Sequence, residues 1–256
     1  MRIVVKIGTS TLAHATGNLN IRRIGELCAC LSDMKNAGHE VIMVSSGAIG
    51  MGVGKLGLRQ RPTDIPTKQA AAAVGQCELM YIYDKLFSEY HHTVAQLLIT
   101  NDNMIHEARH QNFCNTLNRL LELGALPIIN ENDTVATDEI VIGDNDTLAA
   151  KVARAVEADL LILLSDIDGL YTSDPHKDPN AVLLHKVTKI DDYIMNLAGV
   201  SSTTQGTGGM VTKLHAAEIC LSCGCDMVIA NGKDPNNLYA ILDGQDVGTR
   251  FTEECV

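Results

Sequence analysis

Short runs rich in valine, isoleucine and leucine alternate along the chain with segments that have helical spacing. They lie at residues 2–7, 41–45, 94–99, 126–129, 160–164 and 226–230. Runs of this length that are almost continuously apolar are typical of strands buried on both faces, which occur in parallel sheets. The alternation therefore predicts an α/β fold with a largely parallel sheet and helices on both faces.

Capping and spacing signals place the first helix most clearly. Asn20 can cap it, Gly38 can end it, and apolar residues recur between them at helical spacing. Further elements are helices over 147–157 and 210–223, a small hairpin over 134–143, and a loop followed by a short strand pair over 171–190. An irregular loop is also expected that contains Arg59, Arg61, Pro62 and Pro66. Because no proline-rich linker divides the chain, we expect one domain with a lobe boundary near residue 155.

Length, charge and composition restrict the classes of protein that are possible. The chain has 256 residues, 46% of them hydrophobic, and lacks a run of about 18 apolar residues that could span a bilayer. The apolar run that begins at Ile3 is too short for a signal-peptide core. The net charge of −11 opposes binding to nucleic acid. We therefore expect a cytoplasmic protein with reduced cysteines and without membrane or nucleic-acid partners.

Small, polar and charged residues follow several of the predicted strands. Ligands bind at the carboxyl ends of strands in sheets of this kind, so these residues are the first candidates for a site. They form the segments Lys6 to Ser10, Ser45 to Ala48, Asn130 to Asp133 and Ser165 to Gly169. We expect their side chains to converge on one edge of the sheet.

Two segments combine glycines with a lysine. Lys6 interrupts an apolar strand and precedes Gly8 and two hydroxyl residues, which could bind phosphate; a lysine that reaches solvent from the strand end is the alternative. Glycines also open the helix over 210–223, where Lys213 lies one turn in, and a flexible linker is the alternative there. Together the two segments could hold a polyphosphate from opposite sides.

Acidic and amide residues gather at the start of the helix predicted over 147–157. Asn145 and Asp146 could each simply cap that helix. Together with Asp133 they are more than capping requires. They are therefore candidate ligands for a polar group.

Three other patterns match known motifs without the required context. His106 and His110 have the spacing of a zinc-binding helix, but the flanking residues are polar and a third ligand is missing, which favours a solvated helix face. Residues 52–57 match a dinucleotide fingerprint but do not directly follow a strand, and Leu56 replaces the Ser or Thr of a Walker loop. A cysteine cluster lacks the second pair of a zinc site: Cys220, Cys223 and Cys225.

The combined motifs resemble those of the amino acid kinase family, and within it the members that phosphorylate free glutamate. The resemblance runs nearly from end to end, through residues 5–10, 46–49, 73–76, 129–133, 143–146 and 206–210. Aspartate and acetylglutamate kinases of the family typically have Lys-x-Gly-Gly where this chain has Lys6-Ile7-Gly8-Thr9.

The resemblance implies an open αβα sandwich around a mainly parallel sheet of about eight strands. It places the substrate in an N-terminal lobe, about residues 1–155, and the nucleotide in a C-terminal lobe, about residues 156–256. Many relatives carry an extra C-terminal PUA domain. We expect this chain to be a short form without it, because the sequence stops at Val256.

The resemblance also implies roles for individual residues. The candidate catalytic residues are Lys6, Gly8, Asp146 and Lys213, with Asp146 between the two lysines. The candidate substrate-binding residues are Ser46, Asp133 and Asn145. The candidate nucleotide-binding residues are Lys6, Ser165, Asp166, Thr207, Gly208, Gly209, Met210, Val211, Thr212 and Lys213. No side chain is assigned as a direct metal ligand.

The implied cofactors are ATP and Mg²⁺, the implied substrate is L-glutamate, and proline is implied as a feedback inhibitor. Relatives often form dimers or tetramers, so a homo-oligomer is expected. A nucleotide-binding regulatory protein on the same fold is one alternative, although the presence of Lys6, Asp146 and Lys213 argues for turnover. A kinase for another substrate, such as a nucleoside monophosphate or carbamate, is the other.

Overall fold

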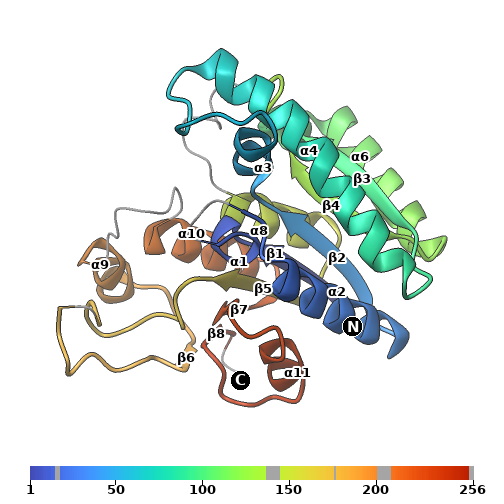
Figure 1. Cartoon of the computed structure of the whole chain (residues 1–256). Coiled ribbons are helices and arrows are strands. Elements are labelled where there is room, and N and C mark those ends of the chain that lie inside the picture. Colours follow the sequence, from blue (N-terminus) through green and yellow to red (C-terminus); the bar gives the residue numbers. More distant parts are fainter. Residues whose placement is uncertain (15–17, 137–144, 176, 201–208, 254–256) are drawn as a thin grey trace.

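The computed structural model describes residues 1–14, 18–136, 145–175, 177–200 and 209–253, and within them the chain forms one sheet with helices on both faces (Figure 1). The order of the eight strands is β3-β4-β2-β1-β5-β7-β8-β6. Neighbouring strands are parallel except for β7 and β8, which are antiparallel. The strands are β1 Arg2–Ile7, β2 Glu40–Ser45, β3 Val94–Ile99, β4 Leu126–Glu131, β5 Leu160–Ser165, β6 Lys186–Val187, β7 Asp226–Asn231 and β8 Thr249–Phe251.

The helices divide between the two faces of the sheet. The described helices are α1 Thr9–Leu12, α2 Ile21–Asn36, α3 Ala48–Lys55, α4 Ile65–Ser88, α5 Asn101–Ile105, α6 Glu107–Glu122, α8 Asn145–Ala155, α9 Asp192–Val200, α10 Met210–Leu221 and α11 Asn237–Leu242. One buried apolar cluster packs α6, α8, α9 and α10 on the sheet, and a second packs α2, α3, α4 and α11 on the other face. The predicted sandwich is therefore confirmed.

Strand β1 lies at the centre of the sheet and decides which way Lys6 points. Successive side chains of a strand alternate between its faces. Val4 belongs to the apolar cluster of α8 and α10, whereas Ile3 and Val5 belong to the cluster of α2 and α4. Lys6 shares the face of Val4, so its side chain extends toward α8 and α10.

The two halves of the sequence occupy two halves of the sheet. Strands β1 to β4 form the side β3-β4-β2-β1, and strands β5 to β8 form the side β5-β7-β8-β6. The change falls between α8, which ends at Ala155, and β5. The chain therefore passes from the first half of the sheet to the second close to residue 155, and β1 pairs with β5 where the two halves meet. The division into two lobes stays a prediction.

The predicted strands and the first helix are confirmed. Each of the apolar runs forms a strand that starts or ends within two residues of its predicted limits. Asn20 caps α2 by accepting a hydrogen bond from the Arg23 amide at 3.1 Å, and Gly38 follows the helix with φ +93°. At that backbone angle a glycine carries no steric cost. The hairpin predicted over 134–143 falls mostly outside the described residues.

Two predicted helix limits and one loop assignment were wrong. α8 begins at Asn145 rather than at residue 147, and α10 ends at Leu221 rather than at residue 223. Pro66, predicted to lie in an irregular loop, is in the first turn of α4, which Asp64 caps by accepting from the Thr67 amide at 2.9 Å. Proline fits that turn because its missing N–H has no partner there in any helix.

Glycines in α3 and α4 let the two helices touch backbone to backbone. A Cβ added at Gly52 would lie 1.8 Å from the carbonyl oxygen of Ala71, and one at Gly75 would lie 1.8 Å from that of Ala48. Both distances are impossible, so each position excludes every side chain. Within the glycine pattern at residues 52–57, Gly52 thus has a packing role inside α3, whereas Gly57 follows that helix with φ +65°. The pattern does not form a loop between a strand and a helix.

The histidine pattern also differs from the motif it matches. His106 has extended backbone angles, φ −81° and ψ 116°, and precedes α6. His106 and His110 therefore do not share a helix face. Among the residues that the structure describes, no group of three or more His, Cys, Asp or Glu side chains is placed to hold a metal ion. No described helix has both the length and the apolar character that crossing a bilayer requires.

Candidate active site

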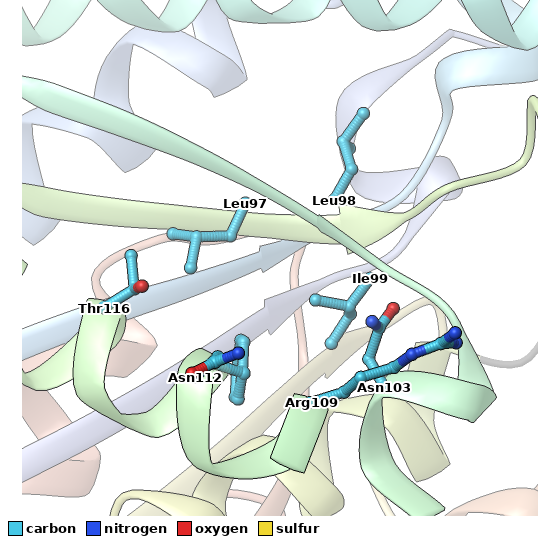
Figure 2. A pocket seen from close by; sticks show the side chains of 8 residues that line it. Leu97, Leu98, Ile99, Asn103, Arg109, Asn112 and Thr116 are labelled. Atoms are coloured by element: carbon cyan, nitrogen blue, oxygen red, sulfur yellow. The ribbon is translucent and has the colours of Figure 1, made fainter. Parts of the chain in front are cut away.

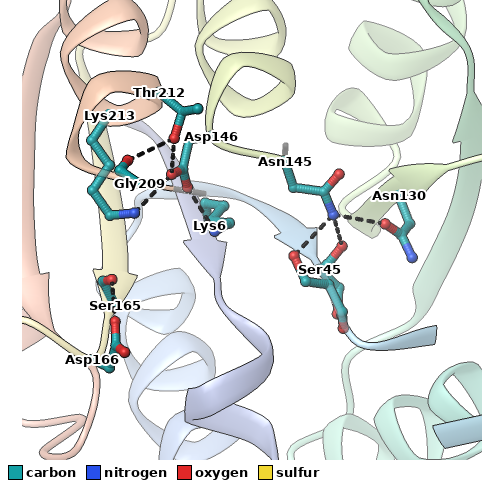
Figure 3. Close-up of polar contacts among 11 residues, drawn as sticks. Lys6, Ser45, Asn130, Asn145, Asp146, Ser165, Asp166, Gly209, Thr212 and Lys213 are labelled. Atoms are coloured by element: carbon teal, nitrogen blue, oxygen red, sulfur yellow. Dashed lines mark hydrogen bonds and ion pairs between the residues drawn. The ribbon is translucent and has the colours of Figure 1, made fainter. Parts of the chain in front are cut away.

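The carboxyl ends of the central strands and the first turns of α8 and α10 meet at one place, as the strand-end pattern predicts (Figure 3). β1 contributes Lys6, α8 contributes Asn145 and Asp146, and α10 contributes Lys213. Figure 3 shows Asp146 directed toward the two lysines and Asn145 directed toward Ser45 and Asn130. The site thus has a charged part and a neutral part.

The charged part, here called the charged cluster, consists of Lys6, Asp146 and Lys213. The Nζ atom of Lys6 lies 2.6 Å from Oδ1 of Asp146, and that of Lys213 lies 2.9 Å from Oδ2. The side chains are 11%, 1% and 6% exposed for Lys6, Asp146 and Lys213. Each carboxylate oxygen therefore holds one ammonium group, which is the arrangement predicted from sequence.

The charges of this cluster do not cancel. Burial by itself would raise the pKa of the Asp146 carboxyl, but the ammonium groups of Lys6 and Lys213 outweigh burial and lower that pKa from 3.8 to about 2. The carboxylate is therefore ionised at neutral pH, and two cations accompany one anion. Excess buried charge is costly unless a counter-ion approaches. The cluster is suited to receive an anion such as a phosphate group.

Thr212 supports the cluster from the first turn of α10. Its Oγ1 lies 3.3 Å from Oδ2 of Asp146 and donates to the carbonyl oxygen of Gly209 at 2.8 Å. Met210 is buried, whereas Val211 is exposed beside it. The helix start adds partial positive charge to the same region. Two further residues predicted to bind nucleotide lie outside the described residues, Thr207 and Gly208.

The neutral part, here called the amide network, consists of Ser45, Ser46, Gln76, Asn130 and Asn145. The Nδ2 atom of Asn145 lies 2.9 Å from the Ser45 carbonyl oxygen, 2.9 Å from Ser46 Oγ and 3.0 Å from Asn130 Oδ1. The Nδ2 atom of Asn130 in turn donates to Gln76 Oε1 at 2.8 Å. The predicted residues Ser46 and Asn145 are thus in direct contact.

Asp133 and the β5 residues flank these two parts. Asp133 is half-buried in the turn after β4 and interacts with other groups of the protein. Ser165 ends β5 and donates from Oγ to Oδ1 of the exposed Asp166 at 3.1 Å. Gly8, predicted to offer its amide to a phosphoryl group, donates that N–H to the Leu164 carbonyl oxygen at 3.2 Å.

Gly8 nevertheless lies beside the charged cluster. A Cβ at this position would be 3.9 Å from Lys6 Nζ and 3.2 Å from the Leu164 carbonyl oxygen. A larger residue would therefore crowd the ammonium group from the side of β5. The glycine leaves space there, whatever its amide contacts.

Sequence reasoning named Gln76 only within a motif of the family resemblance and Asn130 only within a candidate strand-end segment, and gave neither an individual role. The structure places both inside the amide network. Both are buried, with 8% and 2% exposure. The available signal was a polar residue in an otherwise apolar context: Gln76 follows a run of alanine and glycine, and Asn130 ends an apolar strand. A buried amide requires hydrogen-bond partners, and that requirement could have indicated both.

A separate hollow lies over the edge strand β3 and helix α6 (Figure 2). Leu97, Ile99 and Phe113 form its apolar part, and Arg109 and Asn112 are among its polar residues. None of the residues predicted to bind substrate or nucleotide lines it. It is therefore distinct from the candidate active site.

The open, mainly parallel sheet and the two lysines paired with one carboxylate at its centre define an α/β protein with a site suited to bind phosphate. The chain belongs to the amino acid kinase family, whose model, described as "Amino acid kinase family", matches residues 1–231.

Curated relatives match over nearly the whole chain. It is 52% identical over 254 residues to glutamate 5-kinase of Clostridium perfringens, covering 98% of this chain and 94% of that protein. It is 50% identical over 257 residues to glutamate 5-kinase of Listeria innocua, covering 99% and 93%. The glutamate 5-kinase of Caldanaerobacter subterraneus is 51% identical over 251 residues, which cover 98% of this chain and 68% of that protein.

Solved structures share the fold at low sequence identity. Carbamate kinase from Giardia lamblia bound to AMP-PNP has a TM-score of 0.70 at 16% identity and covers 99% of this chain and 98% of its own. UMP kinase from Ureaplasma parvum has a TM-score of 0.65 at 18% identity and covers 98% of both. These similarities confirm the amino acid kinase fold alone.

Proposed function

We infer that the chain is a glutamate 5-kinase, which transfers the γ-phosphate of ATP to the side-chain carboxylate of L-glutamate and so opens proline biosynthesis. Identity of about half over nearly full length to several glutamate 5-kinases supports this substrate. The structural observation that carries it is the charged cluster, a buried site with excess positive charge adjoining a neutral amide network. Phosphoryl transfer between two anions requires the excess positive charge, and an amino acid substrate suits the neutral amide network.

Catalysis by this site rests on charge and position. The γ-carboxylate of glutamate is ionised at neutral pH, with an ordinary pKa of about 4.3, so it needs no general base. Lys6 and Lys213 would neutralise charge on the transferred phosphoryl group, and Asp146 would hold both ammonium groups in place. A carboxylate suits that task because it accepts from each lysine through a separate oxygen.

The amide network would bind the amino acid end of glutamate. Since Ser46 Oγ accepts from Asn145, its hydroxyl hydrogen is available to a substrate carboxylate. The Asn145 nitrogen faces its protein acceptors, so its oxygen, which points away from them in Figure 3, is the atom that would meet the α-ammonium group. The negative charge of the Asp133 carboxylate would attract the same ammonium group.

ATP would lie against the second half of the sheet. Ser165, Asp166 and the residues from Thr207 to Lys213 would bind it, with glutamate on the first half of the sheet. Gly8 would contact the phosphoryl group only if its N–H left the Leu164 carbonyl oxygen. The lobes divided near residue 155 would thus each bring one substrate to the charged cluster.

Mg²⁺ would be held mainly by ATP. Magnesium commonly takes one or two protein carboxylates or none, with water and phosphate oxygens as its other ligands. Both oxygens of Asp146 face lysines, so this carboxylate would hold the ammonium groups and leave the metal to other oxygen ligands. When bound, the metal would supply further neutralisation of the phosphate charge.

The test is ADP formation in the presence of Mg²⁺ and a panel of acceptors. Glutamate should give the highest turnover, and hydroxylamine should trap the labile acyl phosphate as the hydroxamate. Acetylglutamate, aspartate, carbamate and UMP serve as rival acceptors. Equal or faster turnover with any of them would overturn the assignment, and ATP binding without turnover would indicate a regulatory protein instead.

A further inference from the structure

Helix α4 directs two buried polar side chains toward the strand ends that carry the candidate site. Gln76 and Tyr83 lie seven residues apart, about two helical turns, and are 8% and 0% exposed. Gln76 contacts Asn130 at the end of β4, and the Tyr83 hydroxyl contacts Ser45 Oγ at the end of β2 at 2.9 Å. Gln76 belongs to the amide network through its contact with Asn130 but has no assigned contact with substrate, and Tyr83 lies outside both parts of the site.

Gln76 and the Glu131 backbone amide together determine which way the Asn130 amide faces. Asn130 Oδ1 accepts from Asn145 Nδ2 at 3.0 Å and from the Glu131 amide at 2.9 Å. Asn130 Nδ2 then faces Gln76 Oε1, an acceptor, at 2.8 Å. A flipped Asn130 would set its Nδ2 against two other donors and its oxygen against the Gln76 oxygen, so every contact would become repulsive.

Asn130 and the Ser45 carbonyl oxygen together determine the orientation of Asn145. An acceptor at Asn130 draws the Asn145 nitrogen toward the protein together with the Ser45 carbonyl and Ser46 Oγ. The Asn145 oxygen then faces the opposite way. The position of α4 therefore affects, through the contact of Gln76 with Asn130 and that of Asn130 with Asn145, where the Asn145 oxygen lies. That oxygen is the atom assigned to the substrate ammonium group.

The packing of α4 against α3 holds Gln76 in a fixed position. Its neighbour Gly75 touches the backbone of Ala48 so closely that no Cβ could be inserted. Ala48 begins α3 only two residues after Ser46. The backbone beside Gln76 and the backbone beside Ser46 are therefore held against each other.

We propose that Gln76 is a positioning residue for glutamate, which acts through Asn130 to orient the Asn145 amide. This inference rests on the proposed function. Gln76 touches no reacting group, so its loss should weaken glutamate binding and leave the charged cluster and ATP binding unchanged. Replacing Gln76 should therefore separate KM for glutamate from both kcat and KM for ATP.

The experiment compares Gln76→Leu, Gln76→Glu and Tyr83→Phe by steady-state kinetics and thermal unfolding. Gln76→Leu removes the acceptor at similar volume and should raise KM for glutamate about tenfold, or about 1.4 kcal/mol. Gln76→Glu keeps an acceptor oxygen and should stay within about threefold of the wild-type KM. Tyr83→Phe removes a buried hydrogen bond from the same helix to Ser45 Oγ. It leaves Asn130 and the Ser45 carbonyl oxygen that contacts Asn145 in place, so it should lower Tm and leave KM unchanged.

The outcomes separate positioning from general destabilisation. Equal KM values for Gln76→Leu and Tyr83→Phe would overturn the proposal, as would an equal loss in kcat or in ATP binding for Gln76→Leu. If Gln76→Leu does not fold, Gln76→Met provides the same comparison, because it too lacks the amide oxygen. Failure of Gln76→Glu to restore KM would also count against it.

A readout without turnover keeps this inference separate from the proposed function. Side-chain amide hydrogens of Asn145, assigned by NMR with an Asn145→Ser sample, should exchange faster in Gln76→Leu than in Tyr83→Phe. Unchanged exchange would show that Gln76 does not hold the Asn145 amide. A wild-type protein inactive toward glutamate would instead refute the function and leave this comparison valid.

Discussion

Two consecutive residues at the start of α8 serve the two parts of the site in different ways. Asn145 and Asp146 are about 100° apart around the helix, as neighbours on any α-helix are. Asp146 pairs with two lysines, whereas Asn145 bonds to neutral oxygens of β2 and β4. The first turn of α8 therefore connects the charged cluster, which is held by ion pairs, to the amide network, which is held by neutral hydrogen bonds.

The difference between the charged cluster and the amide network predicts how strongly a substitution in each part should change the enzyme kinetics. Removing one partner of a buried ion pair leaves an uncompensated charge and costs several kcal/mol. Removing one neutral hydrogen bond costs about 1 to 3 kcal/mol when the other partner stays buried. Substitutions in the charged cluster should therefore affect the transition state strongly, and those at the amide network should mainly affect substrate affinity.

The largest effect is expected from Lys6→Ala and Lys213→Ala. Each should lower kcat by about two to four decades, because a preorganised charge contact contributes roughly 3–5 kcal/mol to the transition state. Substrate binding should suffer less. Steady-state kinetics with both substrates measures this, and Lys55→Ala, which removes an exposed lysine paired with Glu78, is the control expected to remain active. A near-normal kcat for Lys6→Ala would place that lysine away from the phosphoryl group.

Asp133→Ala tests the contacts assigned to the amino acid end of glutamate. It should raise KM for glutamate about ten- to hundredfold with little change in kcat, because it removes a contact to the ammonium group that exists before and during reaction. KM for ATP should not change. Initial rates at varied glutamate and fixed ATP measure this effect. A loss in kcat comparable to that of Lys6→Ala would mean that the two parts do not act separately.

Acid unfolding should reveal the charged cluster without any substrate. The Asp146 pKa is lowered from 3.8 to about 2 in the folded protein, so its contribution to stability is present above about pH 4 and is lost as the pH falls through 2. That contribution is about 2 kcal/mol. Urea unfolding at several pH values should therefore show a weaker acid dependence in Asp146→Asn than in the wild type. Parallel pH profiles would contradict the low pKa.

Much of the fold could be predicted because burial leaves a clear pattern. Central strands such as β1 and β5 are mostly apolar, since both of their faces are covered, and Lys6 and Ser165 stand out near their carboxyl ends. The strands β6 and β8 span only two and three residues, too few to show a period. Their pairing with each other joins distant parts of the chain, which no local pattern records.

The site was predictable where chemistry alone singles out a residue. A lysine inside an apolar strand requires an anionic partner, and the contacts of Lys6 and Lys213 with Asp146 are confirmed, while their catalytic roles stay predictions. The start of α8 was placed two residues late because its first turn is polar and shows no helical period. The inward direction of Gln76 depends on the contact between α3 and α4, which sequence spacing does not determine.

The smallest effect concerns proline, which would use only the amide network. Proline keeps the α-carboxylate and a charged α-nitrogen, so it fits the atoms assigned to Ser46, Asp133 and Asn145, but it has no γ-carboxylate to bring to the charged cluster. Inhibition should therefore weaken several-fold as glutamate rises and should not respond to ATP. Substitutions in the loop and helix start over residues 57–76, such as Arg61→Ala, should relieve it while sparing kcat. A proline titration at low and high glutamate decides this: no inhibition at millimolar proline, or inhibition indifferent to glutamate, would reject a shared site.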